Sequence, residues 1–401
     1  MNTLQNSETL NLKKLARNYR QELLSNVIPF WESHSIDHSE GGYFTCLDRK
    51  GKVYDTDKFI WLQARQVYTF SKLYLEVEAR SEWLEIAKHG AEFLIKNGRD
   101  ENGDWYFSLD RFGVPLVNSY NIFSDCFAAL AFGTLYKADP HTKYKDICLQ
   151  TFERILQRQE NPKKSFNKVH PRARKSQNFA LPMIICNLSK ELSHLIDKKV
   201  ADQLARDIEH KLMYDFYIED KNLILENVGI DGHFMDTFDG RLVNPGHAIE
   251  AMWFVMDQAH ARGDHDMVKI ALKRAIRMIE YGWDNQHGGI FYFLDAGGHP
   301  PQQLEWDQKL WWTHLEALVC LAKGIAYLDD SKCKMWFEKI HNYTWGNFKD
   351  NQYPEWFGYL NRQGEVLLNL KGGKWKGCFH VPRSLLLISQ SLESTTSKSV
   401  K

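Results

Sequence analysis

The sequence lacks long hydrophobic runs, an excess of either charge and a leader-like N-terminus. No apolar run approaches the roughly 20 residues that span a bilayer, and residues 1–15 contain no long apolar segment of the signal-peptide kind. The 51 Lys and Arg residues equal the 51 Asp and Glu residues in number. A formal net charge of zero gives no basic field for nucleic acid or an anionic membrane, so we expect neither as a partner.

Paired cysteine motifs and nucleotide-binding glycine motifs are also missing. An odd number of cysteines without a CxxC pair is typical of reduced, mostly buried thiols, so we predict a cytoplasmic protein. The chain contains neither GxGxxG nor the P-loop spacing of glycines. The seven cysteines are Cys46, Cys126, Cys148, Cys186, Cys320, Cys333 and Cys378.

Aromatic residues, by contrast, are abundant, at 13% of the 401 residues. Two interpretations stay open. With 43% apolar residues the chain has material for a large core, where aromatic side chains need no further explanation. Aromatic faces also stack on the apolar faces of sugar rings, so a carbohydrate site would use the same residues.

A short pattern recurs four times: an aromatic residue, two residues, Leu, Asp or Asn, two residues and Gly. Asp or Asn at the first turn position and Gly at the fourth favour a type I turn, so each copy predicts a β-hairpin. The glycines are 62, 185 and 66 residues apart, and 185 is about three times 62, so two degenerate copies are expected, at 233–240 and around 165–175. The clear copies are FTCLDRKG (44–51), YFSLDRFG (106–113), FYFLDAGG (291–298) and FGYLNRQG (357–364).

Between the hairpins the hydrophobic period becomes that of helices, with two helices in each interval. Stretches at 10–31 and 379–392 add one helix each, which gives twelve helices in six pairs. We predict an all-α fold, an (α/α)6 barrel of six helix pairs with short β-hairpins over one mouth; an open α-solenoid is the alternative. The hairpins favour the barrel because they can gather over one mouth. Residues 1–392 are expected to form a single catalytic domain and residues 393–401 a polar, disordered tail.

Polar residues recur near the start of the first helix of several units, where a core-facing helix should be apolar. His247 and Glu250, for example, are three residues apart and share a helix face. Residues at the same place in four units should converge at one end of a barrel, as an active site requires. The alternatives are histidines satisfied within the core and ion pairs that hold a buried arginine. The residues are Arg65, His247, Glu250, His314, Glu316, His380 and Arg383.

The same residue types could also serve zinc binding or glycoside hydrolysis. Two His and two Glu would suit zinc, but the chain has no HExxH, and the flanking Trp, Arg and Phe residues are not typical of a ligand sphere, so we expect no metal. A glycosidase on the same barrel needs two carboxyl groups, for which Glu250, Glu316 and Glu355 are available. That interpretation leaves the pair of histidines unexplained.

Four segments resemble the N-acylglucosamine 2-epimerase family over nearly the whole chain: NPGHAIEAMWF, LWWTHLEAL, PEWFGYLNRQG and LKGGKWKGCFHVPR. The last two are typical of the N-acetylglucosamine 2-epimerase branch rather than of its cellobiose 2-epimerase and mannose isomerase relatives. The resemblance implies an (α/α)6 barrel, no metal, a homodimer, and ATP as an activator that is not consumed. By motif it implies catalytic roles for Arg65, His247, Glu316 and His380, with Glu250 supporting the first histidine.

The expected reaction is the reversible 2-epimerisation of N-acetyl-D-glucosamine and N-acetyl-D-mannosamine. Two histidines on opposite faces of C2 would remove and return its proton, and Arg65 would stabilise the enolate oxygen. We assign His380 as the base for N-acetylglucosamine and His247 as the base for the reverse direction. No cofactor is required for this chemistry. Expected substrate contacts are Trp61, Asn178, Trp311, Trp375 and Arg383.

Alternatives to this function are an isomerase or 2-epimerase of mannose or cellobiose-type sugars, and a non-catalytic protein of the renin-binding kind. A basic stretch, QENPKKSFNKVHPRARK, resembles the segment linked to nucleotide activation in the family, although the resemblance implies glycine where Lys164 stands. A solvated basic loop is the other interpretation of this stretch. Its candidate effector residues are Lys163, Lys164 and Lys168, within a run that also holds Arg172, Arg174 and Lys175.

Overall fold

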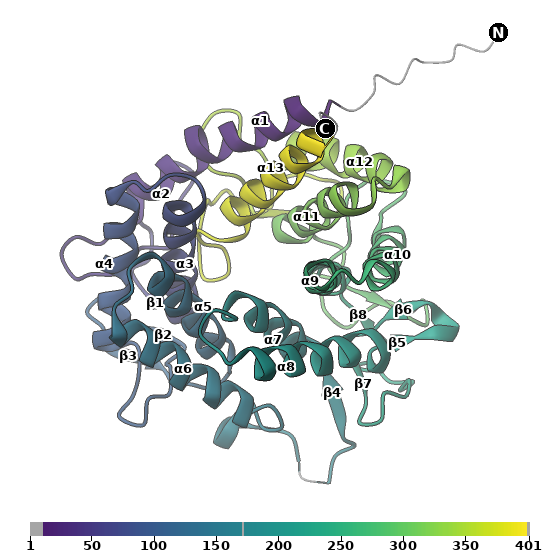
Figure 1. Cartoon of the computed structure of the whole chain (residues 1–401), viewed down its shortest axis with the longest axis horizontal. Coiled ribbons are helices and arrows are strands. Elements are labelled where there is room, and N and C mark those ends of the chain that lie inside the picture. The colour runs from purple at the N-terminus through teal and green to yellow at the C-terminus, as the bar shows by residue number, and fades with distance from the viewer. Residues whose placement is uncertain (1–10, 171, 399–401) are drawn as a thin grey trace.

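The computed structural model describes residues 11–170 and 172–398, and it shows a ring of helices in two layers (Figure 1). The inner helices are buried on almost every side, whereas the outer ones bury one stripe and expose the other. The inner layer consists of α3 (Ile60–Glu76), α5 (Phe123–Ala138), α7 (Ala180–Glu191), α9 (Pro245–Arg262), α11 (Trp311–Leu328) and α13 (His380–Lys398). The outer layer consists of α4 (Ser81–Asn97), α6 (Thr142–Gln157), α8 (Lys198–His210), α10 (His265–Gly282), α12 (Ser331–Asn347), and α1 (Leu12–Glu22) with α2 (Ile28–His34).

The ring is closed by the two ends of the chain. α1 of the outer layer packs against α13 of the inner layer, as the sequence predicted for the sixth pair. In the inner layer the Thr69 hydroxyl donates a hydrogen bond to the carbonyl of Cys378 at 2.7 Å, and the rings of Tyr68 and Phe379 lie 5.6 Å apart. The (α/α)6 barrel is therefore confirmed and the open solenoid is wrong.

The terminal helices differ in extent from the sequence prediction. The first one begins at Leu12, and Leu10 lies outside the described residues. α13 continues to Lys398, so helix extends well into the segment 393–401 that was predicted as a tail. Residues 399–401 of that segment lie outside the described residues.

Local sequence signals explain why α9 starts and stops where it does. Asn244 caps the helix, since its side chain accepts a hydrogen bond from the backbone N–H of His247 at 3.1 Å. Pro245 follows in the first turn, where no backbone donor is needed. Gly263 ends the helix with a φ of 76°, a left-handed conformation that glycine adopts at little cost. These signals fix His247 in the first turn of an inner helix.

Short antiparallel strand pairs lie at one end of the ring. The strand before an inner helix pairs with a hairpin strand from later in the chain, which links neighbouring units. β1 (Lys58–Phe59), β2 (Ser108–Leu109) and β3 (Pro115–Val117) form one sheet, and the pairs are β4 (Ser176–Asn178) with β7 (Asn227–Gly229), β5 (Tyr217–Ile218) with β6 (Leu223–Ile224), β8 (Leu242–Val243) with β9 (Leu294–Asp295), and β10 (Lys309–Leu310) with β11 (Tyr359–Leu360).

The four clear repeat copies form the predicted turns. In the second copy the N–H of Gly113 donates to the carbonyl of Asp110 at 3.2 Å, and Gly113 has a φ of 91°. The same bond closes the other three turns, and each of their glycines also has a positive φ. Aspartate or asparagine and glycine are needed here because the side chain accepts from the following backbone N–H groups and the last residue is left-handed.

The two degenerate copies were placed wrongly. In the fourth unit the equivalent turn is Gly229–Gly232, closed by a 2.9 Å bond between the N–H of Gly232 and the carbonyl of Gly229. The segment 233–240 lies just beyond this hairpin. The described part of 165–175 contains a short 3-10 helix, Lys164–Phe166, followed by coil, and pairing resumes only at Ser176. Neither copy keeps the aromatic and Leu positions that identify the others, so spacing alone misplaced them.

Three ion clusters join the hairpins to one another, each made of a buried Asp, a buried Lys and a partly exposed Arg. In one, Lys371 Nζ lies 2.9 Å from Asp350 Oδ2, and Arg49 Nε lies 2.7 Å from the same oxygen. Because Arg49 belongs to the first hairpin and Asp350 to the last unit, this cluster closes the hairpin layer into a ring. The other two clusters are Asp37–Lys58–Arg111 and Asp284–Lys309–Arg362.

All seven cysteines are free and buried, as predicted. Among the described helices, none combines the length and the apolar character that a bilayer crossing requires.

Candidate active site

Charged side chains from equivalent positions on different inner helices meet at the barrel axis. Arg65, Glu250 and Glu316 are each the sixth residue of their helix, α3, α9 and α11. On α13, Arg383 follows His380 by three residues, just as Glu250 follows His247 on α9. The repeat therefore places two arginines and two glutamates in one buried, electrically balanced layer. Arg65, Glu250 and Arg383 are 8%, 6% and 6% exposed, and Glu316 is fully buried.

Arg383 holds the two carboxylates together. Its Nη2 lies 2.5 Å from Glu250 Oε1 and 2.6 Å from Glu316 Oε1. The other oxygen of Glu316 accepts from Trp253 Nε1 at 3.0 Å. Charge-assisted bonds of this kind are strong when buried, so the geometry gives Arg383 a positioning role beneath the site in addition to the substrate contact predicted for it.

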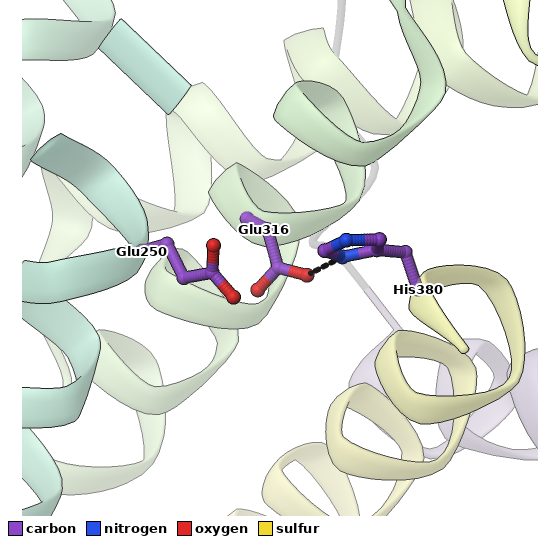
Figure 2. A group of neighbouring side chains, drawn as sticks. All are labelled: Glu250, Glu316 and His380. Atoms are coloured by element: carbon purple, nitrogen blue, oxygen red, sulfur yellow. Dashed lines mark hydrogen bonds and ion pairs between the residues drawn. The ribbon is translucent and has the colours of Figure 1, made fainter. Parts of the chain in front are cut away.

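His380 is oriented by the same glutamate (Figure 2). Its Nδ1 lies 2.8 Å from Glu316 Oε1. Since a carboxylate only accepts, Nδ1 carries the proton and the lone pair of Nε2 is left for chemistry. Burial, aided by the positive charges of Arg65 and Arg383, lowers the pKa of His380 well below its ordinary value. His380 is therefore neutral at neutral pH, the form that a base requires.

His247 has a different carboxylate partner from the one expected. Its Nδ1 lies 3.1 Å from both oxygens of Glu226, whereas Glu250 bonds Arg383. Glu226 is thus the residue that supports His247, and the support predicted from Glu250 is limited to its charge. Burial by itself would lower the pKa of His247, but the charge and hydrogen bond of Glu226, together with the charge of Glu250, outweigh it and raise the pKa above its ordinary value.

Glu226 was missed because the fourth hairpin was misaligned. Its carbonyl accepts from the N–H of Phe179 at 2.9 Å, as the carbonyl of Phe107 accepts from the N–H of Ile60 at 3.0 Å. Glu226 and Phe107 therefore occupy the same hairpin position, at the mouth of the barrel. Aligning the turn Gly229–Gly232 with the clear copies would have identified Glu226 as a polar residue in that position.

Trp312 lies between the two histidines and was also not predicted. Its ring centre is 5.3 Å from that of His247 and 5.9 Å from that of His380. The two imidazoles, which come from α9 and α13, thus contact a common indole. The signal for it was present in the sequence as the second Trp of LWWTHLEAL.

Arg65 presents a buried cation among aromatic rings. Its guanidinium carbon lies 3.9 Å from the ring centre of Phe127, 4.4 Å from that of Trp61 and 4.6 Å from that of Phe379. Among the described residues, Arg65 Nε finds no hydrogen-bond partner. Burial lowers the pKa of Arg65, and the charge of Arg383 lowers it further, yet a guanidinium stays protonated at neutral pH. An unsatisfied buried donor near His380 suits an oxygen of a bound molecule.

The other predicted substrate contacts are spread around the mouth. Trp375 is 52% exposed, and its ring lies 5.7 Å from that of Trp61. Trp311 is buried, with its ring 6.2 Å from that of His380. Asn178 lies on β4 beside Glu226 and donates from Nδ2 to the Glu226 carbonyl at 3.3 Å.

Two candidate residues lie outside this cluster. His314 is fully buried and satisfied on both nitrogens, with Nδ1 2.7 Å from the Leu310 carbonyl and Nε2 accepting from the N–H of Ile290 at 2.9 Å. Burial lowers the pKa of His314 to about 3, which matches the core-histidine alternative. Glu355 bonds Trp31 and Lys376 instead of residues of this cluster.

The cluster in Figure 2 was tested as a metal site. Ligand atoms of Glu250, Glu316 and His380 lie within 4.8 Å of one another. Arg383 Nη2, however, already bridges both carboxylates. A second cation between them would repel the guanidinium, so this donor set does not fit a divalent ion while Arg383 is in place.

The chain is similar to known proteins in sequence and in fold. The model of the family N-acylglucosamine 2-epimerase (GlcNAc 2-epimerase) matches residues 42–382. N-acylglucosamine 2-epimerase of Mus musculus is 38% identical over 394 residues, covering 96% of this chain and 93% of that one, and the Bos taurus protein is 37% identical, covering 94% and 90%. Cellobiose 2-epimerase from Bacillus thermoamylovorans has the same fold, with a TM-score of 0.81 at 18% identity over 94% of this chain and 99% of that one.

Proposed function

The chain belongs to the N-acylglucosamine 2-epimerase family of isomerases, and on that premise we propose that it interconverts N-acetyl-D-glucosamine and N-acetyl-D-mannosamine with two histidine bases. The observation that carries this proposal is the pair of Glu–His dyads, Glu226–His247 and Glu316–His380. Each dyad fixes Nδ1 and leaves Nε2 for a substrate. The dyads come from different units, so they approach a bound carbon from different sides.

The reaction needs no redox step. The sugar opens to its aldehyde, which acidifies the hydrogen on C2. Neutral His380 removes that proton through Nε2, and the electron pair of the C–H bond moves to the C1 oxygen as an enolate. Arg65 stabilises the enolate charge. His247, protonated at Nε2, then returns a proton to the opposite face of C2, and ring closure gives N-acetylmannosamine.

The two histidines are tuned for this direction of proton flow. Burial and the nearby arginines lower the pKa of His380 and so favour its neutral, basic form, whereas the Glu226 carboxylate raises the pKa of His247 and so favours its protonated, acidic form. Opposite shifts at neighbouring groups are how one site holds an acid and a base at the same pH. In the reverse direction the roles exchange.

Substrate identity is tested by proton NMR of the purified chain with each sugar in turn. We expect conversion of N-acetylglucosamine and N-acetylmannosamine to a common equilibrium mixture, and much slower turnover of mannose and cellobiose. Turnover of free mannose or cellobiose, with none of the acetylated sugars, would replace this proposal with that of a mannose isomerase or cellobiose-type epimerase.

Substitution Glu226→Gln tests the His247 dyad. Loss of the carboxylate charge should lower the pKa of His247, so less of the acid form exists at neutral pH. In the N-acetylglucosamine direction the rate is lost as pH rises through this pKa, and that loss should begin at a lower pH than in the parent protein. We expect kcat to fall ~10-fold or more at neutral pH, as read from the pH profile of kcat. Glu219→Gln, at an exposed residue, should leave the profile unchanged; an unchanged profile in Glu226→Gln as well would refute the role.

We further propose activation by ATP without hydrolysis, and a homodimer, both from the family resemblance. An open groove of ≈ 580 Å³ lies between β3 and residues 165–168 of the basic stretch, and Lys168 lines it. This groove supports the proposed effector site. Lys163 is exposed, but Lys164 Nζ is bonded to Asp104 Oδ1 at 2.6 Å. Lys164 has a φ of 47°, which agrees with glycine being usual at this position. The NMR assay with and without ATP, and sedimentation analysis, test these two proposals.

A further inference from the structure

The segment 371–377, called the strap, leads into α13 (Figure 1), and it carries Trp375, whose ring lies 5.7 Å from that of Trp61. Only the tip of the strap is exposed. Trp375 is 52% exposed, whereas Lys371 and Lys376 on either side of it are 0% and 1% exposed. Burying two ammonium groups in one short loop is costly unless each has partners, so the contacts of these lysines define how the strap is held.

Both lysines bond one residue, Glu355. Lys376 Nζ donates to Glu355 Oε1 at 2.8 Å, and it also donates to the carbonyl of Lys371 at 2.7 Å. Lys371 Nζ donates to the backbone carbonyl of Glu355 at 2.6 Å and to Asp350 Oδ2 at 2.9 Å. The two ends of the strap are therefore clamped to one another and to a single fixed glutamate.

Glu355 itself is held in an unusual conformation. Its φ is 65°, a left-handed value that non-glycine residues seldom adopt, and its side chain is fully buried. Trp31 Nε1 donates to Glu355 Oε2 at 2.7 Å. Gly358 provides room for the lysine stem, because a Cβ there would lie 2.8 Å from Lys376 Cδ. The surroundings thus enforce one position for the carboxylate and for the lysine that it binds.

We propose that Glu355 and Lys376 are positioning residues for the epimerase reaction: they clamp the base of the strap so that the Trp375 ring is ordered to stack on the sugar before it binds. The strap tip lies next to the catalytic cluster, since Trp375 contacts Trp61, whose ring centre is 4.4 Å from the Arg65 guanidinium carbon. A platform ordered in advance spares the sugar the entropy cost of ordering the loop. This inference rests on the proposed function, because it takes a sugar as the molecule that Trp375 contacts.

The test is a mutant cycle that combines the clamp with Trp375. Replacing the pair together, Glu355→Gln with Lys376→Met, removes both charges and so avoids an unpaired buried ion. We expect KM for N-acetylglucosamine to rise about 10-fold with kcat within about 2-fold, because binding and not proton transfer is affected. Trp375→Ala should raise KM by a similar factor. Since both act through the same ring, the triple variant should show no further increase.

A matched control is the buried pair Asp37 and Lys58, whose Oδ2 and Nζ lie 3.0 Å apart under another hairpin. Asp37→Asn with Lys58→Met should lower stability without changing KM. If the clamp variant does not fold, Glu355→Gln alone, which keeps an acceptor for Lys376, should still raise KM, about 3-fold. An additive triple variant, or a clamp variant that loses only stability, would show that Glu355 and Lys376 are merely structural.

Failure of the proposed function is distinguishable from failure of this inference. If the parent chain does not convert the acetylated sugars, the function is wrong, and the cycle is repeated by calorimetric titration with whichever sugar the parent does convert. Additivity in that titration would then refute the clamp by itself.

Discussion

Replacing His380 with Asn is expected to stop epimerisation in both directions while leaving one half of the proton exchange intact. Each histidine variant should lose about 10²–10⁴-fold in kcat, the usual contribution of a general acid or base. In deuterated water, His380→Asn should no longer exchange the C2 hydrogen of N-acetylglucosamine. It should still exchange that of N-acetylmannosamine through His247, without forming the other sugar. His247→Asn should show the reverse preference.

The geometry explains why the two losses should differ. His380 Nδ1 is held by Glu316 and His247 Nδ1 by Glu226, so neither imidazole depends on the other for its orientation. Each variant therefore keeps one oriented base. His265, an exposed residue at the start of α10, provides a matched control. His265→Asn should leave unchanged the exchange rates of both sugars and the epimerisation rates in both directions.

Two results would contradict the two-base site. A single histidine serving both faces, with the intermediate rotating between proton removal and return, would leave one variant active in both directions. Loss of all exchange in both variants, with retained thermal stability, would mean that both histidines are needed for one proton transfer. Retained stability also excludes unfolding as the cause.

The sequence was sufficient for the fold because the repeat is local and redundant. Turn chemistry in 44–51, 106–113, 291–298 and 357–364 marks four units independently, so the period survives two degenerate copies. The register of the repeat then places Arg65, Glu250 and Glu316 at equivalent positions, and a closed ring forces equivalent positions to converge. For these residues, the position within the repeat unit was therefore enough to predict that their side chains meet at the barrel axis.

The side-chain partners that the sequence did not predict depend on contacts between different repeat units, and no local sequence pattern indicates such contacts. Glu226 supports His247 from a hairpin whose pattern had decayed, and Arg383 bonds glutamates that are 133 and 67 positions away in the chain. Glu250 was given the wrong partner for the same reason: its spacing from His247 is that of helix neighbours, but its side chain points to α13. Sequence fixes which face a residue occupies, and packing decides which neighbour it meets there.

Loss of Arg383 should destabilise the barrel strongly. Arg383→Ala leaves Glu250 and Glu316 buried without the cation that bonds them both, and breaking a buried ion pair from one side costs about 3–5 kcal/mol. We expect this decrease in the free energy of urea unfolding. Combining Arg383→Ala with Glu250→Gln removes one of the stranded charges and should recover part of the stability, which makes the double variant the matched control.

The same substitution should create a zinc site. With the guanidinium gone, carboxylate oxygens from Glu250 and Glu316 and a nitrogen of His380 remain within 4.8 Å of one another, a donor set that zinc binds at about 2.0–2.2 Å after a modest inward movement. Zinc should therefore raise the thermal midpoint of Arg383→Ala but not that of the parent protein, in which Arg383 occupies the space between the carboxylates. If zinc stabilises both proteins equally, then Arg383 does not occupy the space that zinc would take. If Arg383→Ala is as stable as the parent without metal, then Arg383 is not the cation that holds this layer together.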